Sequence, residues 1–332
     1  MQIAVIGAGS WGSTLANLLA RNGHEVSLWV REKELAEEMR DKRENTWFLP
    51  GVSLHEGITT ITTSIAEAVA GKGYILIVVP AQFVRPVLEQ MLPHLHPSPV
   101  LICASKGIEV SSLKTMSQVV EEVLSSLSPI YAVLSGPSFA KEVSRGLPTA
   151  VALGCREVEV ARRIQHLFSC DYFRVYTNVD YKGVELGGAI KNVIAIGAGI
   201  CDGLGFGDDA RAALITRGLA EMARLGERMG ANKETFMGLS GLGDLVLTCT
   251  GDLSRNRQVG LRIGAGAKLE DILKEMKMVA EGVKTCEALY RLGEKMGVEM
   301  PITQQVYSIL YRGKDPRDAV EELMLRRLKS EW

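Results

Sequence analysis

Short apolar runs alternate with helix-patterned segments through the first half of the chain. Continuous apolar runs, rich in β-branched residues, predict six strands: Ile3–Ile6, Val26–Val30, Ile75–Val79, Val100–Ala104, Tyr131–Leu134 and Ala150–Leu153. Runs without a polar face are typical of strands that a parallel sheet buries on both faces. Helical spacing of apolar positions predicts helices between or after these strands, at Ser13–Arg21, Lys33–Lys42, Ser112–Leu127 and Val158–Phe168. The alternation predicts a doubly wound α/β domain.

The pattern changes near Val184, where long segments rich in Ala, Leu, Met, Glu and Arg begin. Their amphipathic spacing predicts helices at Asp208–Met229, Leu269–Met276, Cys286–Met296 and Ile302–Leu310. We therefore predict an α/β domain over residues 1–182 and an all-α C-terminal domain over residues 183–332. A chain of 332 residues is long enough to give each domain a sizeable core.

Composition narrows the classes of function. A formal net charge of −1 gives no basis for binding nucleic acid or an anionic membrane surface. The six cysteines are scattered, without the spacing of a metal site, so we predict no metal and a reducing compartment. The N-terminus lacks the basic start of a secretory signal, and only ten uncharged residues separate Lys191 from Asp202 in the most apolar stretch. We expect a cytoplasmic protein without stable membrane insertion.

A glycine motif follows the first predicted strand and opens the first helix. The residues Gly7-Ala8-Gly9-Ser10-Trp11-Gly12 match the GxGxxG pattern of a Rossmann-type dinucleotide-binding domain. In that pattern the first glycine makes a tight turn, the second admits the pyrophosphate, and the third allows close helix–strand packing. The helix N-terminus then offers free N–H groups to the phosphates.

The residues after the second predicted strand bear on the choice of coenzyme. Arg31 occupies the position where a basic side chain favours the 2′-phosphate of NADP, whereas an acidic residue there binds the 2′-hydroxyl of NAD. Glu32 follows directly and could serve that hydroxyl if the strand ran one residue further. We expect NADP or NAD, with NADPH favoured by Arg31; a plain surface charge is the alternative for Arg31.

Three further strand ends carry residues suited to a ligand, because ligands of open α/β sheets lie beyond the carboxyl ends of the strands. The turn Val79-Pro80-Ala81-Gln82 is a candidate wall for the nicotinamide, and Lys106 places an amine at the next strand end. The stretch Ser135-Gly136-Pro137-Ser138 then leads into a predicted helix, although any strand-to-helix connection needs such a turn.

Lys191 is the most unusual residue of the second half. It lies in VELGGAIKNVIAIGAGICDG, residues 184–203, where nearly every neighbour is small and apolar. Burying an amine without a partner is costly, so its pKa shifts or it finds a partner. The alternative is a lysine whose stem packs on the core while its head reaches water. The glycines at 187, 188, 197 and 199 predict room for close packing between the domains and for substrate near the amine.

Two later stretches complete the candidate chemistry. GLSGLGD surrounds the Asp244 carboxylate with glycines, and Ser254 is a predicted helix N-cap followed by Arg255 and Asn256. Free N–H groups, a hydroxyl and a guanidinium together suit a phosphate, although a Ser-capped helix with solvated arginines is the plainer alternative.

Taken in order, these motifs resemble the NAD(P)-dependent sn-glycerol-3-phosphate dehydrogenases of the bacterial type. The resemblance covers the whole chain and rests on GAGSWG, ASKG, SGPSFAKEV, ELGGAIKNVIAIGAGICDGLGFGDDARAALITRGLAEM, GLSGLGDLVLTCTGDLSRNRQVG and VAEGVKT. It implies reversible reduction of dihydroxyacetone phosphate to sn-glycerol 3-phosphate for phospholipid synthesis, and a homodimer.

The resemblance also implies roles for individual residues. The implied catalytic residues are Lys191, as the proton donor and acceptor, with Lys106, Asn192 and Asp244. The implied substrate-binding residues are Lys106, Gly136, Ser138, Lys191, Asp244, Thr248, Ser254, Arg255 and Asn256. The implied cofactor-binding residues are Gly7, Gly9, Ser10, Trp11, Gly12, Arg31, Lys106, Ala140, Arg255, Val279 and Glu281.

Two other functions remain open on the sequence. Another two-domain β-hydroxyacid-type dehydrogenase would also join a dinucleotide domain to a helical one and use a lysine. A non-catalytic NAD(P)H-sensing protein would bind the dinucleotide without turnover. The Ser254–Asn256 stretch favours a phosphorylated substrate over a carboxylic acid.

Overall fold

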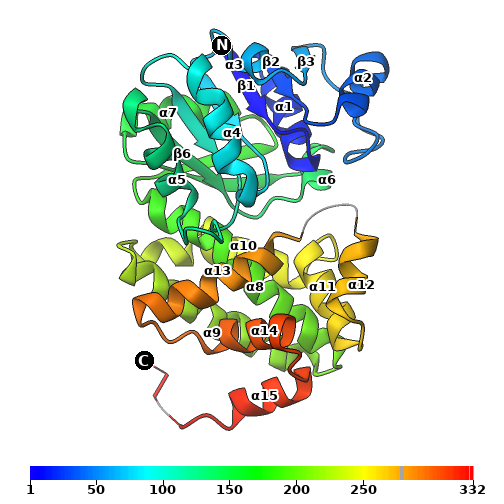
Figure 1. Ribbon diagram of the computed structural model, residues 1–332, viewed down its shortest axis with the longest axis vertical. Helices are drawn as coiled ribbons and strands as arrows, with labels where there is room; N and C mark the ends of the chain where they lie inside the picture. Colours follow the sequence, from blue (N-terminus) through cyan, green and yellow to red (C-terminus); the bar gives the residue numbers. More distant parts are fainter. Residues whose placement is uncertain (277–279, 329, 332) are drawn as a thin grey trace.

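The structure is a computed structural model that describes residues 1–276, 280–328 and 330–331. A sheet with helices on its faces forms the N-terminal half, and a helical half lies against one end of that sheet (Figure 1). The N-terminus lies at one end of the molecule and the helix Pro316–Met324 (α15) at the other. The fold class predicted from the sequence is confirmed.

Eight strands form one sheet in the order β3-β2-β1-β4-β5-β6-β7-β8. Their bounds are β1 Gln2–Ile6, β2 Glu25–Trp29, β3 Ile58–Thr62, β4 Tyr74–Ile77, β5 Val100–Cys103, β6 Ile130–Ser135, β7 Thr149–Cys155 and β8 Phe173–Asn178. The order reverses direction beside β1, because β2 and β3 lie on one side of it and β4 on the other. A dinucleotide binds at such a reversal.

One strand pair departs from the parallel sheet that the sequence predicted. β7 runs antiparallel to β6, with Ser135 opposite Ala152, while β8 is again parallel to β7. An antiparallel partner starts at the edge where the previous strand ends, so the short connection between them stays at that edge. The SGPSFA turn is therefore held at the carboxyl ends of the parallel strands.

Helices cover both faces of the sheet. Their bounds are α1 Ser10–Arg21, α2 Lys33–Lys42, α3 Ile65–Val69, α4 Val84–Met91, α5 Met116–Val123, α6 Ala140–Val143 and α7 Val158–Phe168, with 3₁₀ turns η1 Ala81–Phe83, η2 Leu92–His94 and η3 Ser125–Leu127. Apolar residues of α1, α2 and α7 share one core with one face of the sheet. Residues of α3, α4 and α5 share another core with the opposite face, which is the doubly wound arrangement.

The helical half is built around α8, Tyr181–Gly203, which contains Lys191. Its other helices are α9 Gly207–Arg228, α10 Asp244–Thr250, α11 Arg255–Gly264, α12 Leu269–Glu275, α13 Glu281–Met296, α14 Pro301–Arg312 and α15 Pro316–Met324, with the 3₁₀ turn η4 Lys233–Met237 and the π turn η5 Leu239–Gly243. Among the described residues α8 alone is long and apolar enough to cross a membrane, and it is wholly buried within the protein as a core helix.

Several predicted elements need correction. The edge strands β3 and β8 were missed, and β8 is buried only at alternate positions over its first residues, so it lacks a continuous apolar run. The helix predicted at Ser112–Leu127 is shorter: α5 begins after Thr115, whose hydroxyl and Gln118 form a capping box, and Leu113 before it has a positive φ of 59°.

Candidate active site

Two lysines from different halves of the chain share one buried carboxylate. Lys191 on α8 donates from Nζ to Oδ1 of Asp244 at 2.6 Å and to Oγ1 of Thr248 at 2.6 Å. Lys106, just after β5, donates from Nζ to Oδ2 of Asp244 at 2.6 Å and to the carbonyl oxygen of Gly136 at 3.3 Å. The structure thus brings the candidate site residues Lys106, Gly136, Lys191, Asp244 and Thr248 together.

Burial and neighbouring charges set the pKa values of Lys191 and Asp244 in different ways. Burial lowers the pKa of the Lys191 ammonium to about 8, assisted by the charge of Lys106 and opposed by Asp244. Burial alone raises the pKa of the Asp244 carboxyl, but Lys106 and Lys191 outweigh that effect and hold its pKa below the usual value. The site therefore contains a carboxylate that stays ionised beside an amine able to give up its proton near neutral pH.

Close helix packing places these groups. A Cβ at Gly199 of α8 would lie 2.0 Å from the carbonyl oxygen of Arg257, and one at Gly260 of α11 would lie 2.0 Å from that of Ile196. The two backbones therefore touch, which sets the start of α11 beside the middle of α8. Asp244 begins α10 directly after the π turn η5 and so faces Lys191.

The glycines around Lys191 serve a different purpose from the one predicted. Gly187 packs against the backbone of Ser240 and Gly197 against Leu214 and Val306, all within the helical half. Only Gly188 of the four faces the sheet domain, where a Cβ would lie 2.4 Å from Oγ of Ser135. The prediction that all four leave room between the domains and for substrate is wrong, since these positions are occupied by protein atoms.

The start of α11 carries the candidate phosphate site. Ser254 is its N-cap, and its hydroxyl accepts a hydrogen bond from the N–H of Arg257, as predicted. Asn256 donates to Oδ1 of Asn192 at 2.9 Å and accepts from the N–H of Gly282 at 2.9 Å. Asn192 is thus tied to α11 and not to its neighbour Lys191. The Arg255 side chain is exposed.

The turn after β1 has the shape that a dinucleotide requires. A Cβ at Gly12 would lie 1.8 Å from the carbonyl oxygen of Gly7, and one at Gly7 would lie 2.7 Å from that of Val78. A Cβ at Gly9 would meet nothing within 4 Å. The turn is therefore packed at Gly7 and Gly12 and open at Gly9, where Ser10 and Trp11 begin α1 half-buried.

Arg31 follows β2, the strand that pairs with β1. Its guanidinium donates to Oε1 of Glu32 and lies 6.0 Å from the centre of the Phe83 ring. The Arg31 side chain is 68% exposed, so it can turn toward a ligand. Both residues considered for coenzyme choice are thus paired with each other in this structure.

Glu281 begins α13 in the helical half. Burial raises the pKa of its carboxyl to about 7, against the opposing effects of Arg255 and of the Ala81 N–H. Glu281 therefore lies between the candidate phosphate site and the turn after β4. Val279, predicted with it, lies outside the described residues.

Two buried hydroxyls at the junction of the halves have no hydrogen-bond partner in the part of the chain that the structure describes. They are Oγ of Ser135 and Oγ1 of Thr285. A Cβ at Gly107 would lie 3.2 Å from the Thr285 oxygen.

Two further candidate residues follow β6. Ser138 donates to the carbonyl oxygen of Gly136 at 3.0 Å, and the carbonyl oxygen of Ala140 accepts from Thr14 of α1 at 3.3 Å.

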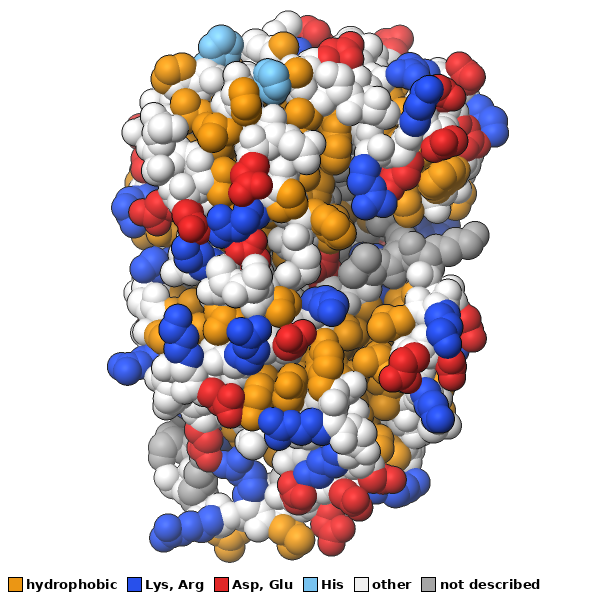
Figure 2. Space-filling model, in the orientation of Figure 1, with side chains coloured by type: hydrophobic (Ala, Val, Ile, Leu, Met, Phe, Trp, Pro, Cys, Tyr) orange, Lys and Arg blue, Asp and Glu red, His pale blue; other side chains and the backbone are white. Residues whose placement is uncertain are grey.

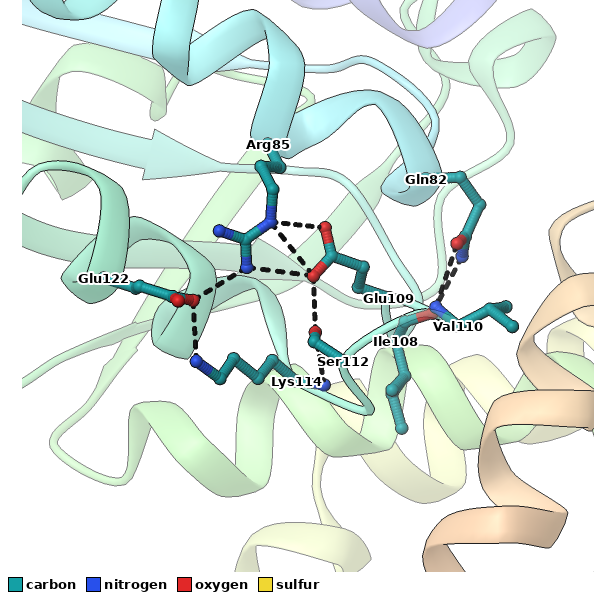
Figure 3. Close-up of polar contacts among 8 residues, drawn as sticks. All are labelled: Gln82, Arg85, Ile108, Glu109, Val110, Ser112, Lys114 and Glu122. Atoms are coloured by element: carbon teal, nitrogen blue, oxygen red, sulfur yellow. Dashed lines mark hydrogen bonds and ion pairs between the residues drawn. The ribbon is translucent and has the colours of Figure 1, made fainter.

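Sequence reasoning missed the residues that hold the Lys106 segment. Gln82, the last residue of the turn expected to wall the nicotinamide, donates to the carbonyl oxygen of Ile108 at 2.8 Å and accepts from the N–H of Val110 at 3.0 Å (Figure 3). Arg85 forms an ion pair with Glu109, whose side chain is 6% exposed. Only the position of Glu109 three residues after Lys106 hinted at this.

The chain matches the sequence models of a known family over most of its length. The model of the NAD-dependent glycerol-3-phosphate dehydrogenase N-terminus matches residues 2–161, and that of the C-terminus matches residues 180–321. This chain belongs to the glycerol-3-phosphate dehydrogenase family. The family predicted from the motifs is confirmed.

Individual relatives agree over their full lengths. The glycerol-3-phosphate dehydrogenase [NAD(P)+] of Solidesulfovibrio magneticus is 59% identical over 331 residues, with 100% of both chains covered. That of Citrifermentans bemidjiense is 60% identical, with 99% of this chain and 98% of the relative covered. The crystal structure of glycerol-3-phosphate dehydrogenase from Coxiella burnetii superimposes with a TM-score of 0.94 at 40% identity, covering 98% of this chain and 99% of that one. The protein is an oxidoreductase that uses NAD or NADP, as predicted.

Proposed function

We propose that the protein reduces dihydroxyacetone phosphate reversibly to sn-glycerol 3-phosphate and that Lys191 exchanges the proton. The observation that carries this proposal is the buried set of Lys191, Asp244 and Lys106, in which an amine with a pKa of about 8 lies beside a fixed carboxylate. The family to which the chain belongs supports the substrate, because its relatives are named glycerol-3-phosphate dehydrogenases.

The turn after β1 fits a nicotinamide dinucleotide. Open space at Gly9 and the free N–H groups at the start of α1 suit a pyrophosphate. The residues proposed to hold the dinucleotide are Gly7, Gly9, Ser10, Trp11, Gly12, Arg31, Lys106, Ala140, Arg255 and Glu281. When bound, the reduced coenzyme supplies a hydride from C4 of its nicotinamide ring to the substrate carbonyl carbon.

Lys191 then serves as the general acid. As the carbonyl carbon is reduced, its oxygen gains negative charge, and the ammonium at Nζ of Lys191 stabilises that charge and donates a proton to it. In the oxidation direction the neutral amine takes the proton from the hydroxyl. Asp244 and Thr248 hold Nζ in place, and Lys106 adds a second positive charge on the other side of Asp244.

The start of α11 binds the substrate phosphate. Arg255 offers a guanidinium, and the helix N-terminus adds free N–H groups and the positive end of its dipole. Ser254 and Asn256 border this position, and we assign Gly136 and Ser138 to the substrate from the sheet domain. Asn192 orients Asn256 through their hydrogen bond.

The remaining assignments follow the same family. The chain divides at residues 182 and 183 into a dinucleotide domain and a substrate domain, close to the start of α8 at Tyr181. NADPH is the favoured coenzyme because Arg31 is basic and exposed. The protein works in the cytoplasm as a homodimer for phospholipid synthesis, and its six free cysteines suit a reducing compartment.

Spaced acidic and basic side chains cover the face seen in Figure 2, without a continuous basic surface. This distribution supports a small-molecule substrate and not nucleic acid. The test is NADPH oxidation, followed by its absorbance, with dihydroxyacetone phosphate or a short β-keto acid. Rapid oxidation with the phosphate and little with the acid is expected. The reverse preference would favour a β-hydroxyacid dehydrogenase, and tight NADPH binding without turnover would favour a sensor.

A further inference from the structure

The segment that carries Lys106 is an irregular loop between β5 and α5. We call residues 104–115 the Lys106 loop. Inside it, Ile108 pairs with Thr115 in an antiparallel bridge, and the N–H of Glu109 donates to the carbonyl oxygen of Lys114 at 2.9 Å. The loop has few regular backbone bonds of its own, so its position depends on side chains from neighbouring elements.

An ion pair between half-buried Arg85 and buried Glu109 fixes the loop to α4 (Figure 3). Arg85 donates from Nε to Oε1 of Glu109 at 2.9 Å and from a terminal nitrogen to Oε2 at 3.0 Å. Ser112 donates to the same Oε2. Arg85 and Ser112 hold the pKa of the Glu109 carboxyl below its usual value although burial acts to raise it. A two-point Arg–carboxylate pair fixes orientation as well as distance.

A second anchor, Gln82, holds the loop at the residues on either side of Glu109. The side-chain amide of Gln82 bonds to the backbone on both sides of Glu109, at the carbonyl oxygen of Ile108 and the N–H of Val110. Arg291 of α13 donates to the carbonyl oxygen of Val110 at 3.1 Å from the helical half. Gly107 lies against Ala81 on one side and Thr285 on the other. The loop is therefore fixed between the two halves of the molecule.

Lys106 depends on these anchors because its ammonium has to reach two acceptors at once. Its ammonium must lie between Asp244 and the carbonyl oxygen of Gly136, and a lysine side chain loses much rotational freedom when held so. Ile108 is only two residues further along the chain, so a shift of the loop moves the Lys106 backbone with it. Misplacing a catalytic group by about 1 Å can cost roughly a hundredfold in rate.

We propose that Gln82 and the Arg85–Glu109 pair are positioning residues that hold Lys106 against Asp244 for the reaction. This inference rests on the proposed function of Lys106. Neither Gln82 nor Glu109 contacts Asp244, Lys191 or the start of α11, so both act through the loop.

The test compares Glu109→Gln and Gln82→Met with Glu159→Gln as the control. Glu159 forms an exposed ion pair with Arg162 within α7, and neither residue belongs to the Lys106 loop or its anchors. For the first two variants we expect kcat/KM for dihydroxyacetone phosphate to fall about ten- to hundredfold. For the control we expect wild-type kinetics. Gln82→Met removes the amide without leaving a buried charge unpaired, so it provides a folded variant if Glu109→Gln does not fold.

A double-mutant cycle separates positioning from general support of the fold. In a Lys106→Ala enzyme, Glu109→Gln and Gln82→Met are expected to cause little further loss of kcat/KM, because the side chain they position is gone. Arg85→Lys is expected to retain more activity than Arg85→Met, since it keeps one charge beside Glu109. Full additivity with Lys106→Ala, or wild-type kinetics for both Glu109→Gln and Gln82→Met, would overturn the inference. A wild-type protein that does not oxidise NADPH with dihydroxyacetone phosphate would instead overturn the proposed function, and this inference with it.

Discussion

Lys191 and Asp244 form a buried pair in which Nζ lies 2.6 Å from Oδ1. Asp244 uses its other oxygen for Lys106, also at 2.6 Å, so one negative charge faces two positive ones. The trio carries a net positive charge when both amines are protonated. An oxygen that becomes negative during reduction therefore meets a site with charge left over to stabilise it.

The first prediction is a pair of opposed pH profiles. Lys191 has a pKa of about 8 and must be protonated to act as the acid. We expect kcat/KM for reduction of dihydroxyacetone phosphate to fall as the pH rises through about 8. For oxidation of sn-glycerol 3-phosphate, kcat/KM should rise over the same range, because the neutral amine is the base.

Thr248→Val provides a check on the origin of that titration. The Thr248 hydroxyl accepts a hydrogen bond from the ammonium and so favours its charged form. Its loss is expected to lower the pKa of Lys191 and move both limbs to lower pH. A limb near pH 6 that does not move in Thr248→Val would point to the substrate phosphate, whose second pKa is about 6.

The second prediction separates two glycines of one turn. Gly9 has a φ of −70°, which any residue can adopt, and a Cβ there would meet no protein atom within 4 Å. Gly9→Ala should therefore fold normally. It should weaken NADPH binding about tenfold or more, because the methyl group lies where the pyrophosphate approaches. Dissociation constants and melting temperatures measure the two effects.

Gly12→Ala is the matched comparison. Its Cβ would overlap the carbonyl oxygen of Gly7, so we expect destabilisation by roughly 1–3 kcal/mol or more. If Gly9→Ala melts early while Gly12→Ala does not, the packing described for the turn is wrong.

The third prediction concerns the substrate phosphate. Arg255→Ala should raise KM for dihydroxyacetone phosphate about tenfold or more, since a hydrogen bond to a charged group contributes about 1.5–3 kcal/mol. Arg262→Ala on the same helix is the control, because Arg262 pairs with Glu275 at the surface. Equal KM values for the two variants would show that the substrate phosphate does not bind at the start of α11.

The fourth prediction concerns coenzyme choice. Arg31→Ala should raise KM for NADPH about tenfold and change KM for NADH by less than about threefold, because only NADPH carries the 2′-phosphate. Lys33→Ala is the control, as Lys33 is a nearby basic residue whose side chain is 78% exposed. Parallel losses for both coenzymes in Arg31→Ala would reject its role at the 2′-phosphate.

The sequence predicted the central strands and missed the edge strands for a physical reason. β1, β4 and β5 are buried on both faces and therefore read as continuous apolar runs. In β8 the residues alternate between buried and exposed over its first half. It therefore lacks the continuous apolar run by which the central strands were recognised. The direction of β7 was also beyond reach, because the apolar pattern of a strand does not encode whether its neighbour is parallel.

The sequence motifs identified the residues of the candidate site but not which of them contact one another. Lys106, Lys191 and Asp244 were singled out from their motifs, yet Lys106 and Asp244 are 138 residues apart and only the fold brings them into contact. The Arg85–Glu109 pair was missed because an arginine and a glutamate 24 residues apart are ordinary surface residues until burial makes their pairing obligatory.

The central claim is that Lys191 exchanges the proton with the substrate, and one substitution tests it most directly. Lys191→Met keeps a similar apolar stem and removes the amine. At saturating NADPH and dihydroxyacetone phosphate we expect kcat to fall about a hundred- to ten-thousandfold, while the dissociation constant for NADPH stays within about threefold of wild type. A Lys191→Met enzyme that keeps most of the wild-type kcat would contradict the account.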